Sequence, residues 1–382
     1  MMTYQQGISI IIPTEGRTQL TCRLIQRLDK LRREVEFSTE VLVIDSSQEA
    51  DRIAILEVCN NFHAEWIEGP SSVRKKRNMG IAKACHSIVL FLDSDCDPHE
   101  NLLKQHWDTI HRQDIPNLGG VLGRLEFTGP ETLAWSLVKN SSLVQQFNLS
   151  AIGNAKWGPT ANLSIRRDIL DKIGPFDEEF PFKLGGDDLD LTYRLTSSGW
   201  ILLKCPDALV YHDRSTWSSL KAVLGRALRW GRMEYHIYKK HASLQLMHPL
   251  SFFGWLILIS LFSVINTVIM QVWQYLILPM GWIVLSLLLF SLCFSIEKKG
   301  AFKEKWSVFR DSLLGGIPEL VYQFGSTFEF LKHGDLRFFY SRPLLNPDWI
   351  TGVWAVEAWN TWSNLLAFLI NYLAITYWVR FA

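Results

Sequence analysis

Charge is missing from one long stretch of this chain and is balanced over the rest. No Asp, Glu, Lys or Arg occurs from Pro249 to Ile296, a run of 48 residues. Over the whole chain, 39 basic and 38 acidic residues leave a formal net charge of +1. A balance this close to zero provides no global field that favours nucleic acid, so we expect no nucleic-acid partner.

Paired cysteines and glycine-rich phosphate loops are also absent. The six cysteines form no CxxC motif, which argues against a zinc cluster or a disulfide framework and fits a reducing cytoplasm. No GxGxxG follows the first expected strand and no GxxxxGKS/T occurs, so a dinucleotide-binding site and a P-loop are excluded. The opening residues, Met1 to Gln6, are polar, so we expect no signal peptide and a cytosolic N-terminal domain.

Residues 1–245 alternate short apolar runs with helical patterns. The expected strands are Ile8–Pro13, Val41–Asp45 and Ile88–Asp93, and the clearest expected helices are Leu20–Leu31 and Ala50–Cys59. This βαβα order predicts a doubly wound α/β domain with a Rossmann-like sheet.

Acidic residues stand where the third of these strands ends. The run Ile88 to Leu92 is apolar without alternation, as in a strand covered on both faces, and Asp93-Ser94-Asp95 follows it. Ligands of such sheets lie beyond the carboxyl ends of the strands, and carboxylate oxygens suit Mg²⁺ or Mn²⁺. The alternative is an ordinary Asp-rich turn. Pro13 to Arg17 and Asp45 to Ser47 follow the other two strands, so all three turns should meet at one edge.

Two further segments carry charge in a concentrated form. Arg74 to Asn78 opens a helix with four consecutive basic residues, which form either a cationic wall for a diphosphate or a solvated face. Gly185-Gly186 precedes Asp187, Asp188 and Asp190 at the start of another helix. Carboxylates there complement the helix dipole, and one of them is also placed to take a proton from an alcohol.

Taken in order, these motifs resemble the family 2 glycosyltransferases of the GT-A fold over roughly residues 7–240. The segments that carry the resemblance are SIIIPTEGR, VLVIDSS, RNMGIAKA, FLDSD, ANLSIRRDIL with IGPFDEEF, and GGDDLDLTYRL. The resemblance implies a nucleotide-sugar donor, with a UDP-sugar as first candidate, a Mg²⁺ or Mn²⁺ cofactor, and displacement with inversion at the anomeric carbon.

The resemblance also implies roles for individual residues. Donor contacts fall on Pro13, Thr14, Glu15, Asp45, Arg77, Asp93 and Ser94; metal contacts fall on Asp95, Asp93 and His212; catalytic roles fall on Asp188 and Asp187. Asp188 would be the general base, although the family's Glu-Asp pair reads Asp-Asp here. His212 has a structural histidine as its alternative.

Arg226 to Trp230 resembles the Gln-x-x-Arg-Trp motif of membrane-embedded polysaccharide synthases, with Arg in place of Gln. Arg229 and Trp230 are the candidate acceptor contacts, and Trp230 could equally be an interfacial tryptophan. The departure from the motif argues against processive synthesis.

The uncharged run is about twice the roughly 20 residues that one membrane helix requires. We expect two spans, at Leu250–Met270 and Tyr275–Ser295, and a third at Ala358–Val379, which contains three asparagines. Lysines and an arginine between 297 and 310 put that side in the cytoplasm by the positive-inside rule. The apolar stripe from Leu313 to Leu331 predicts an amphipathic helix. This helix lies in the membrane–water interface or packs on the catalytic domain.

These observations predict four regions and one activity. The regions are a cytosolic GT-A catalytic domain (1–245), two transmembrane helices (246–296), a basic segment with an amphipathic helix (297–350) and a third transmembrane helix (351–382). The activity is transfer of a sugar to a glycan or lipid-linked acceptor in a multi-pass protein of the cell membrane, with the catalytic domain in the cytoplasm. The alternatives are a catalytically silent GT-A-like membrane scaffold and a processive polysaccharide synthase.

Overall fold

The computed structural model describes residues 4–141, 143–144, 153–181, 185–247, 250–297, 302–339, 341–343 and 350–381. The chain divides into two compact units. Unit 1 comprises residues 1–130 and 146–216, and unit 2 comprises residues 131–145 and 217–382. Each unit is described by itself.

Unit 1 is built on a nine-stranded mixed sheet with the strand order β3-β2-β1-β4-β8-β6-β9-β5, and β7 pairs with β9. The strands are β1 (Gln5–Thr14), β2 (Ser38–Asp45), β3 (Glu65–Glu68), β4 (His86–Leu92), β5 (Cys96–Pro98), β6 (Leu118–Thr128), β7 (Gly153–Ala155), β8 (Asn162–Arg166) and β9 (Ile201–Asp213). β3, β2, β1 and β4 are parallel, whereas β8 runs antiparallel to both β4 and β6. The three predicted strands are confirmed. The sheet is mixed because β8 is antiparallel to its neighbours and because β5 and β7 pair antiparallel with β9.

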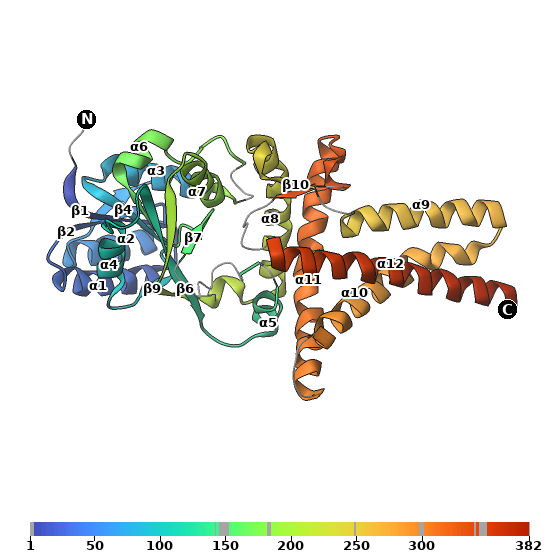
Figure 1. The fold of residues 1–382 in the computed structure, drawn as a ribbon. Coiled ribbons are helices and arrows are strands. Elements are labelled where there is room, and N and C mark those ends of the chain that lie inside the picture. The colour runs from blue at the N-terminus through green and yellow to red at the C-terminus, as the bar shows by residue number, and fades with distance from the viewer. Residues whose placement is uncertain are drawn as a thin grey trace. The chain divides into compact units, whose positions relative to one another are not determined.

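Helices cover both faces of this sheet (Figure 1). One layer contains α1 (Thr18–Arg33), α2 (Glu49–Asn61) and α4 (Leu102–Ile110), and the other contains α3 (Val73–Lys83), α6 (Arg167–Ile173) and α7 (Asp187–Ser197). Alternate residues of β1 supply the two cores, because Ile10 and Ile12 face the first layer whereas Ile11 faces the second. All three are fully buried, which explains the unbroken apolar run in the sequence.

Unit 2 is helical. Its helices are α5 (Leu133–Lys139), α8 (Leu220–Lys240), α9 (Phe252–Met270), α10 (Leu278–Glu297), α11 (Phe302–Lys332) and α12 (Ile350–Phe381), and a short ladder joins β10 (Gln245–Met247) to β11 (Ser341–Pro343). The predicted amphipathic helix is part of α11, which continues through Pro318. By packing, α8 belongs with these helices, and the predicted domain boundary after residue 245 stays a prediction.

One helix of the described part of the chain, α9, is long and apolar enough to cross a membrane, and 22% of its most apolar window is buried. A second apolar segment, Trp273–Leu289, is shorter. The second and third predicted spans coincide with α10 and α12 and stay predictions.

Side-chain hydrogen bonds hold α12 against α10. The Asn371 side chain donates from Nδ2 to the backbone carbonyl of Leu278 at 2.7 Å, and Trp282 Nε1 donates to the backbone carbonyl of Asn364 at 2.9 Å. Both asparagines are buried, at 9% and 1% exposure. These polar groups connect apolar helices to each other, which is a common arrangement where helices associate without water.

Candidate active site

The first strand ends in a turn that brings an arginine to a buried carboxylate. Thr14, the last residue of β1, lies beside Asp45 of β2 in the parallel register. Gly16 (φ 66°) and Arg17 (φ 56°) take left-handed conformations that lead the chain into α1. Arg17 Nη1 then lies 2.6 Å from Asp95 Oδ2. The end of β1 and the turn after β4 therefore meet at the carboxyl edge of the sheet, as predicted.

The four predicted nucleoside contacts at this edge are Pro13, Thr14, Glu15 and Asp45. The Glu15 side chain is 57% exposed, whereas Asp45 is buried. Asp45 Oδ1 accepts hydrogen bonds from Ser47 N (2.8 Å) and Ser47 Oγ (2.5 Å), and its Oδ2 accepts one from Trp66 Nε1 (3.2 Å). Both carboxylate oxygens of Asp45 therefore already accept hydrogen bonds within the protein. A donor nucleobase that hydrogen-bonds to Asp45 would have to share one of these oxygens.

The turn after β4 gives its two carboxylates different surroundings. The side chain of Asp93 is 31% exposed, whereas that of Asp95 is 2% exposed, and Ser94 between them is buried. Burial raises the pKa of Asp95, and the charges of His212 and Arg17 act in the opposite direction. Asp95 is thus a desolvated carboxylate that cations stabilise.

His212 lies on the other side of Asp95. The pairing of β5 with β9 sets Cys96 opposite His212, and His212 Nε2 lies 3.4 Å from Asp95 Oδ1. The ring orientation is held through Nδ1, which lies 3.0 Å from the carbonyl of Asp213 and must therefore donate to it. A neutral His212 consequently turns its Nε2 lone pair toward Asp95.

This pair fits a divalent cation. Asp95 Oδ1 is buried and finds no hydrogen-bond donor among the described residues, and His212 Nε2 lies 3.4 Å from it. A carboxylate oxygen with an imidazole nitrogen is a donor set that Mn²⁺ accepts, with Mg²⁺ tolerating it less readily. Cys96 also approaches both groups, but burial raises the pKa of its thiol well above the usual value. The thiol is protonated at neutral pH and is a poor ligand.

The basic run on α3 is neither a solvated face nor a uniform cationic wall. Arg74 and Lys76 are 1% and 2% exposed. Arg74 donates to the carbonyl of Phe180, and Lys76 Nζ donates to the carbonyl of Thr14 at 2.5 Å. The side chain of Lys75 is 53% exposed. Both alternatives from the sequence are therefore wrong for Arg74 and Lys76, which hold loops to the helix.

Arg77 lies on α3, three residues after Arg74, and contacts two carboxylates. Its Nη2 lies 3.0 Å from Asp93 Oδ1, and its Nη1 lies 2.8 Å from Asp187 Oδ2. The helix can bring Arg77 to this position because Gly80 packs directly on β1. A Cβ at Gly80 would lie 2.5 Å from Ile11 Cγ2. Arg77 thus connects the end of β4 to the start of α7.

The start of α7 carries the two candidate catalytic carboxylates. Gly185 and Gly186 have φ of 84° and 85°, a conformation that side chains disfavour, and they aim the helix start at Arg77. Asp188 Oδ1 accepts from Leu189 N at 2.8 Å. Burial, reinforced by the charge of Asp187, raises the pKa of Asp188 to about 7, and Arg77 opposes this shift.

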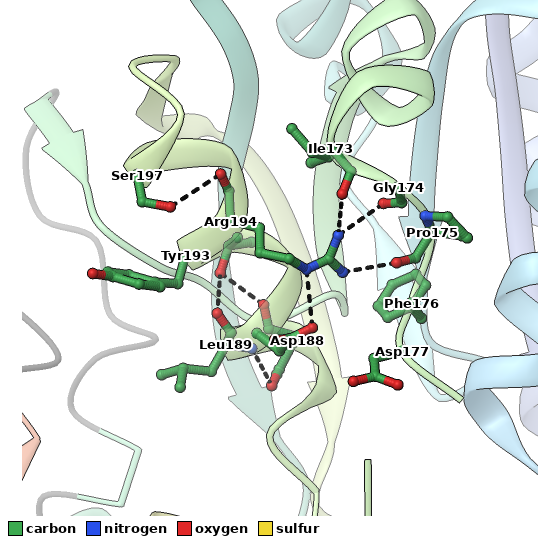
Figure 2. A network of polar contacts seen from close by, with 12 residues as sticks. Ile173, Gly174, Pro175, Phe176, Asp177, Asp188, Leu189, Tyr193, Arg194 and Ser197 are labelled. Atoms are coloured by element: carbon green, nitrogen blue, oxygen red, sulfur yellow. Dashed lines mark hydrogen bonds and ion pairs between the residues drawn. The ribbon is translucent and has the colours of Figure 1, made fainter. Parts of the chain in front are cut away.

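Asp190, the third acid of the motif, is structural. Its Oδ2 accepts from Arg194 Nε at 3.1 Å, and it is 1% exposed. Figure 2 shows the Arg194 guanidinium directed at three consecutive carbonyls. Nη1 donates to Ile173 O (2.5 Å) and Gly174 O (3.0 Å), and Nη2 donates to Pro175 O (2.7 Å). Arg194 therefore joins the IGPF segment to α7.

The same segment is held from the other side by α3. Asn78 Nδ2 donates to Phe176 O at 2.9 Å, and Phe176 N donates to Asn78 Oδ1 at 2.9 Å. The asparagine side chain thereby imitates a backbone partner, and Arg77 lies over the Phe176 ring with Cζ 5.5 Å from its centroid. The segment therefore couples the position of Arg77 to that of the α7 start.

The candidate acceptor residues, Arg229 and Trp230, lie on α8 in unit 2. Trp230 packs edge-on against Trp217, with centroids 5.8 Å apart. Arg226, which stands where the related motif has Gln, places its guanidinium 3.8 Å from the Trp217 centroid. Arg226 is thus part of an aromatic cluster, and the acceptor roles stay predictions.

The contacts of two arginines in the site could not be predicted from the sequence. Arg17 was present in the first strand-end motif, but a backbone turn gives no sign that its side chain reaches Asp95. Arg194 lies in the last motif, and its spacing of four residues from Asp190 is a local signal for that pair. No local signal indicates its contacts with residues 173–175.

A mixed sheet with helices on both faces, and with acidic and basic side chains gathered at its strand ends, is consistent with a Rossmann-like transferase of the GT-A type. The chain belongs to the family described as "Glycosyltransferase like family 2", whose model matches residues 7–232. This match confirms the predicted family, and it supports the predicted enzyme class, a transferase.

Curated relatives agree with this assignment. Glycosyltransferase AglE of Haloferax volcanii is 29% identical over 162 residues, which is 42% of this chain and 50% of that protein. Pre-mycofactocin glycosyltransferase of Mycobacterium tuberculosis is 27% identical over 229 residues, which is 58% of this chain and 46% of that protein. The chain thus matches about half the length of these relatives.

Two solved structures match at lower sequence identity. Mannosyltransferase PcManGT from Pyrobaculum calidifontis, in complex with GDP-Man and Mn²⁺, matches with a TM-score of 0.44 and 14% identity, over 98% of this chain and 88% of that chain. TarS of S. aureus matches with a TM-score of 0.40 and 17% identity, over 62% of this chain and 44% of that chain. Similarities of this size carry no argument about donor, metal or acceptor.

Proposed function

We propose that the protein is an inverting, metal-dependent glycosyltransferase that moves a sugar from a nucleotide-sugar, with a UDP-sugar as first candidate, to a glycan or lipid-linked acceptor. It would act at the cytoplasmic face of a membrane in the synthesis of a polysaccharide or glycoconjugate. The observation that carries this proposal is the position of Arg77 between Asp93 and Asp187, next to the partly buried Asp188, whose pKa is raised.

Direct displacement of the nucleoside diphosphate requires a general base that activates the acceptor hydroxyl next to the bound donor. In the proposed reaction Asp188 accepts the proton of the acceptor hydroxyl while that oxygen attacks the anomeric carbon and the bond to the diphosphate breaks. A pKa of about 7 leaves a useful fraction of Asp188 deprotonated at neutral pH while keeping it basic. One catalytic carboxylate suffices, in contrast to the pair that most glycosidases use.

The donor would bind along the edge formed by β1, β2 and β4. We assign nucleoside contacts to Pro13, Thr14, Glu15 and Asp45, and sugar or ribose contacts to Asp93, Ser94 and Arg77. Asp95, His212 and the exposed side of Asp93 would hold Mn²⁺ or Mg²⁺. When bound, such a cation stabilises the charge that develops on the leaving nucleoside diphosphate.

Arg17 has a place in this proposal as well. Its guanidinium holds Asp95 from the side opposite His212 and is 41% exposed, so it can also reach an anionic ligand. Arginine recognises phosphate oxygens through paired donors. We assign Arg17 a contact with the donor diphosphate.

Membrane attachment would come from the apolar helices of unit 2. α9 exposes seven large apolar side chains, namely Leu258, Leu261, Val264, Ile265, Val268, Ile269 and Met270. An apolar surface of this extent is costly in water and is accounted for by a lipid environment. We propose that α9 and α10 form a membrane hairpin, that α12 is a third span, and that unit 1 is cytoplasmic.

Nucleotide release tests the enzymatic proposal. Purified full-length protein with Mn²⁺, a panel of UDP-, GDP- and dTDP-sugars and a membrane lipid extract should release nucleoside diphosphate with one donor. Product mass spectrometry then identifies the acceptor. Turnover that survives Asp188→Asn unchanged, or release of nucleoside monophosphate instead of diphosphate, would contradict the proposal.

Topology is tested separately with an engineered cysteine in the turn after α9, where Gln271 is exposed. In intact cells a membrane-impermeant maleimide should label Gln271→Cys and should leave Lys104→Cys in unit 1 unlabelled until the cells are lysed. Labelling of both in intact cells, or of neither until lysis, would contradict the proposed hairpin.

A further inference from the structure

A second group of metal-ligand side chains lies outside the active site, where the end of α8 meets the end of α11. His236 on α8 and Glu329 on α11 place Nε2 and Oε1 3.3 Å apart. His333, directly after α11, brings its own Nε2 within 3.5 Å of the same oxygen. The three ligand atoms lie within 4.8 Å of one another. All three residues belong to unit 2.

These separations match a tetrahedral zinc site. Zinc lies about 2.0–2.1 Å from an imidazole nitrogen and about 2.0–2.2 Å from a carboxylate oxygen, so two such ligands at the tetrahedral angle are roughly 3.3–3.5 Å apart. The observed 3.3 and 3.5 Å fall in this interval. As hydrogen bonds, the same contacts are longer than the common distance of about 2.9 Å.

The ligands are held in place by their neighbours. The ring of Tyr235 stacks on His333 with centroids 4.3 Å apart and an interplanar angle of 5°. The same tyrosine ring meets His236 edge-on at 5.2 Å. Glu329 has a side-chain exposure of 2%, and Arg232 Nε holds its other oxygen at 2.6 Å. An ordered shell of this kind orients a ligand set before the metal arrives.

One cation competes for the ligand oxygen. Lys332 Nζ lies 3.3 Å from Glu329 Oε1, but its side chain is 52% exposed and can turn into solvent. Arg232 occupies Oε2 and does not need to move.

We propose that His236, Glu329 and His333 form a zinc site, with water as fourth ligand, that fastens the end of α8 to the end of α11. The proposal does not depend on the proposed function, because none of the three residues has a role in sugar transfer. A zinc ion here would connect the segment before α9 to the segment before β11, so it would fix the base of the apolar helices.

Metal titration of the full-length, detergent-solubilised protein tests the site. The Asp95→Asn background is used so that the active-site carboxylate does not contribute. After chelator treatment, Co²⁺ should bind at one equivalent and produce the visible absorption of tetrahedral cobalt, and Zn²⁺ should displace it. His333→Ala should lower the Zn²⁺ affinity by more than the roughly 10- to 100-fold that loss of an outer-shell partner costs.

His333 is a suitable position because its side chain is 35% exposed, so its removal leaves no buried gap. His241→Ala is the matched control, since His241 lies at the end of the same α8 and outside the cluster. His236→Gln provides a second variant and should also lose the cobalt absorption. Absence of Zn²⁺ binding in the Asp95→Asn protein, or retention of full affinity in both histidine variants, overturns the proposal.

Discussion

The guanidinium of Arg77 and the carboxylate of Asp187 lie 2.8 Å apart, from Nη1 to Oδ2, although 110 residues separate them in the chain. The Arg77 side chain is 7% exposed and that of Asp187 is 12% exposed, so the pair is shielded from solvent. Its position fixes the start of α7 relative to the turn after β4. The catalytic role that we propose for Asp188 depends on this pair.

Arg77→Gln should therefore destabilise unit 1. It leaves Asp187 without its charged partner in a nearly buried position, and breaking a buried ion pair costs about 3–5 kcal/mol. The partial exposure of Asp93 favours the lower end of that interval. Lys75→Gln, two residues away on the exposed side of α3, should change stability by less than about 0.5 kcal/mol. Chemical unfolding followed by tryptophan fluorescence measures both; equal effects would refute the structural role of the pair.

The reaction should have an acidic limb near neutral pH. The base must be deprotonated to act, so kcat/KM should fall as pH drops below the raised pKa of Asp188, about 7. The charge of Asp187 contributes to that raised pKa, so Asp187→Asn should move the limb to lower pH. Arg77 opposes the shift, so Arg77→Gln should move it to higher pH. A pH–rate profile of each variant with saturating Mn²⁺ checks the signs; shifts in the same direction would exclude Asp188 as the titrating base.

Metal dependence should separate Asp95 from Asp97. Asp95 is buried beside His212, whereas Asp97 has a side-chain exposure of 30% and pairs with Arg23. Asp95→Asn should weaken Mn²⁺ binding and lower turnover by at least about a hundredfold, because one charged ligand is lost. Asp97→Asn should leave both nearly unchanged. Mn²⁺ electron paramagnetic resonance measures the affinity directly, and equal losses in the two variants would contradict the assignment.

Strand ends were the most predictable part of the fold and of the site. A parallel strand covered on both faces has no polar positions until it ends. The sequence therefore predicts both the strand at Ile88–Leu92 and the polar turn Asp93-Ser94-Asp95 that follows it. The convergence of such turns follows from parallel pairing alone. The contact of Arg17 with Asp95 was beyond prediction, because it depends on two left-handed residues and on a long side chain.

The basic run on α3 shows why side-chain roles are harder to predict. All four residues of this run carry a basic side chain, but they face four directions of one helix: Arg74, Lys75, Lys76 and Arg77. Only tertiary packing decides that Lys76 meets a carbonyl and Arg77 meets carboxylates. In the same way, the asparagines that dilute the last apolar stretch were interpretable only once Asn371 was seen to bind the backbone of α10.

The close approach of α8 to α11 gives a prediction for unit 2. A Cβ at Gly231 would lie 1.8 Å from the carbonyl oxygen of Tyr322, so the two helices touch backbone to backbone there. Gly231→Ala must push the helices apart and should cost more than about 3 kcal/mol, as strong overpacking does. Gly225→Ala on the same α8 would meet only Arg229 Nη1, at 3.6 Å, and should stabilise the helix by up to about 1 kcal/mol. Thermal unfolding of both variants in detergent measures the difference, and equal melting temperatures would show that α8 and α11 are not packed as described.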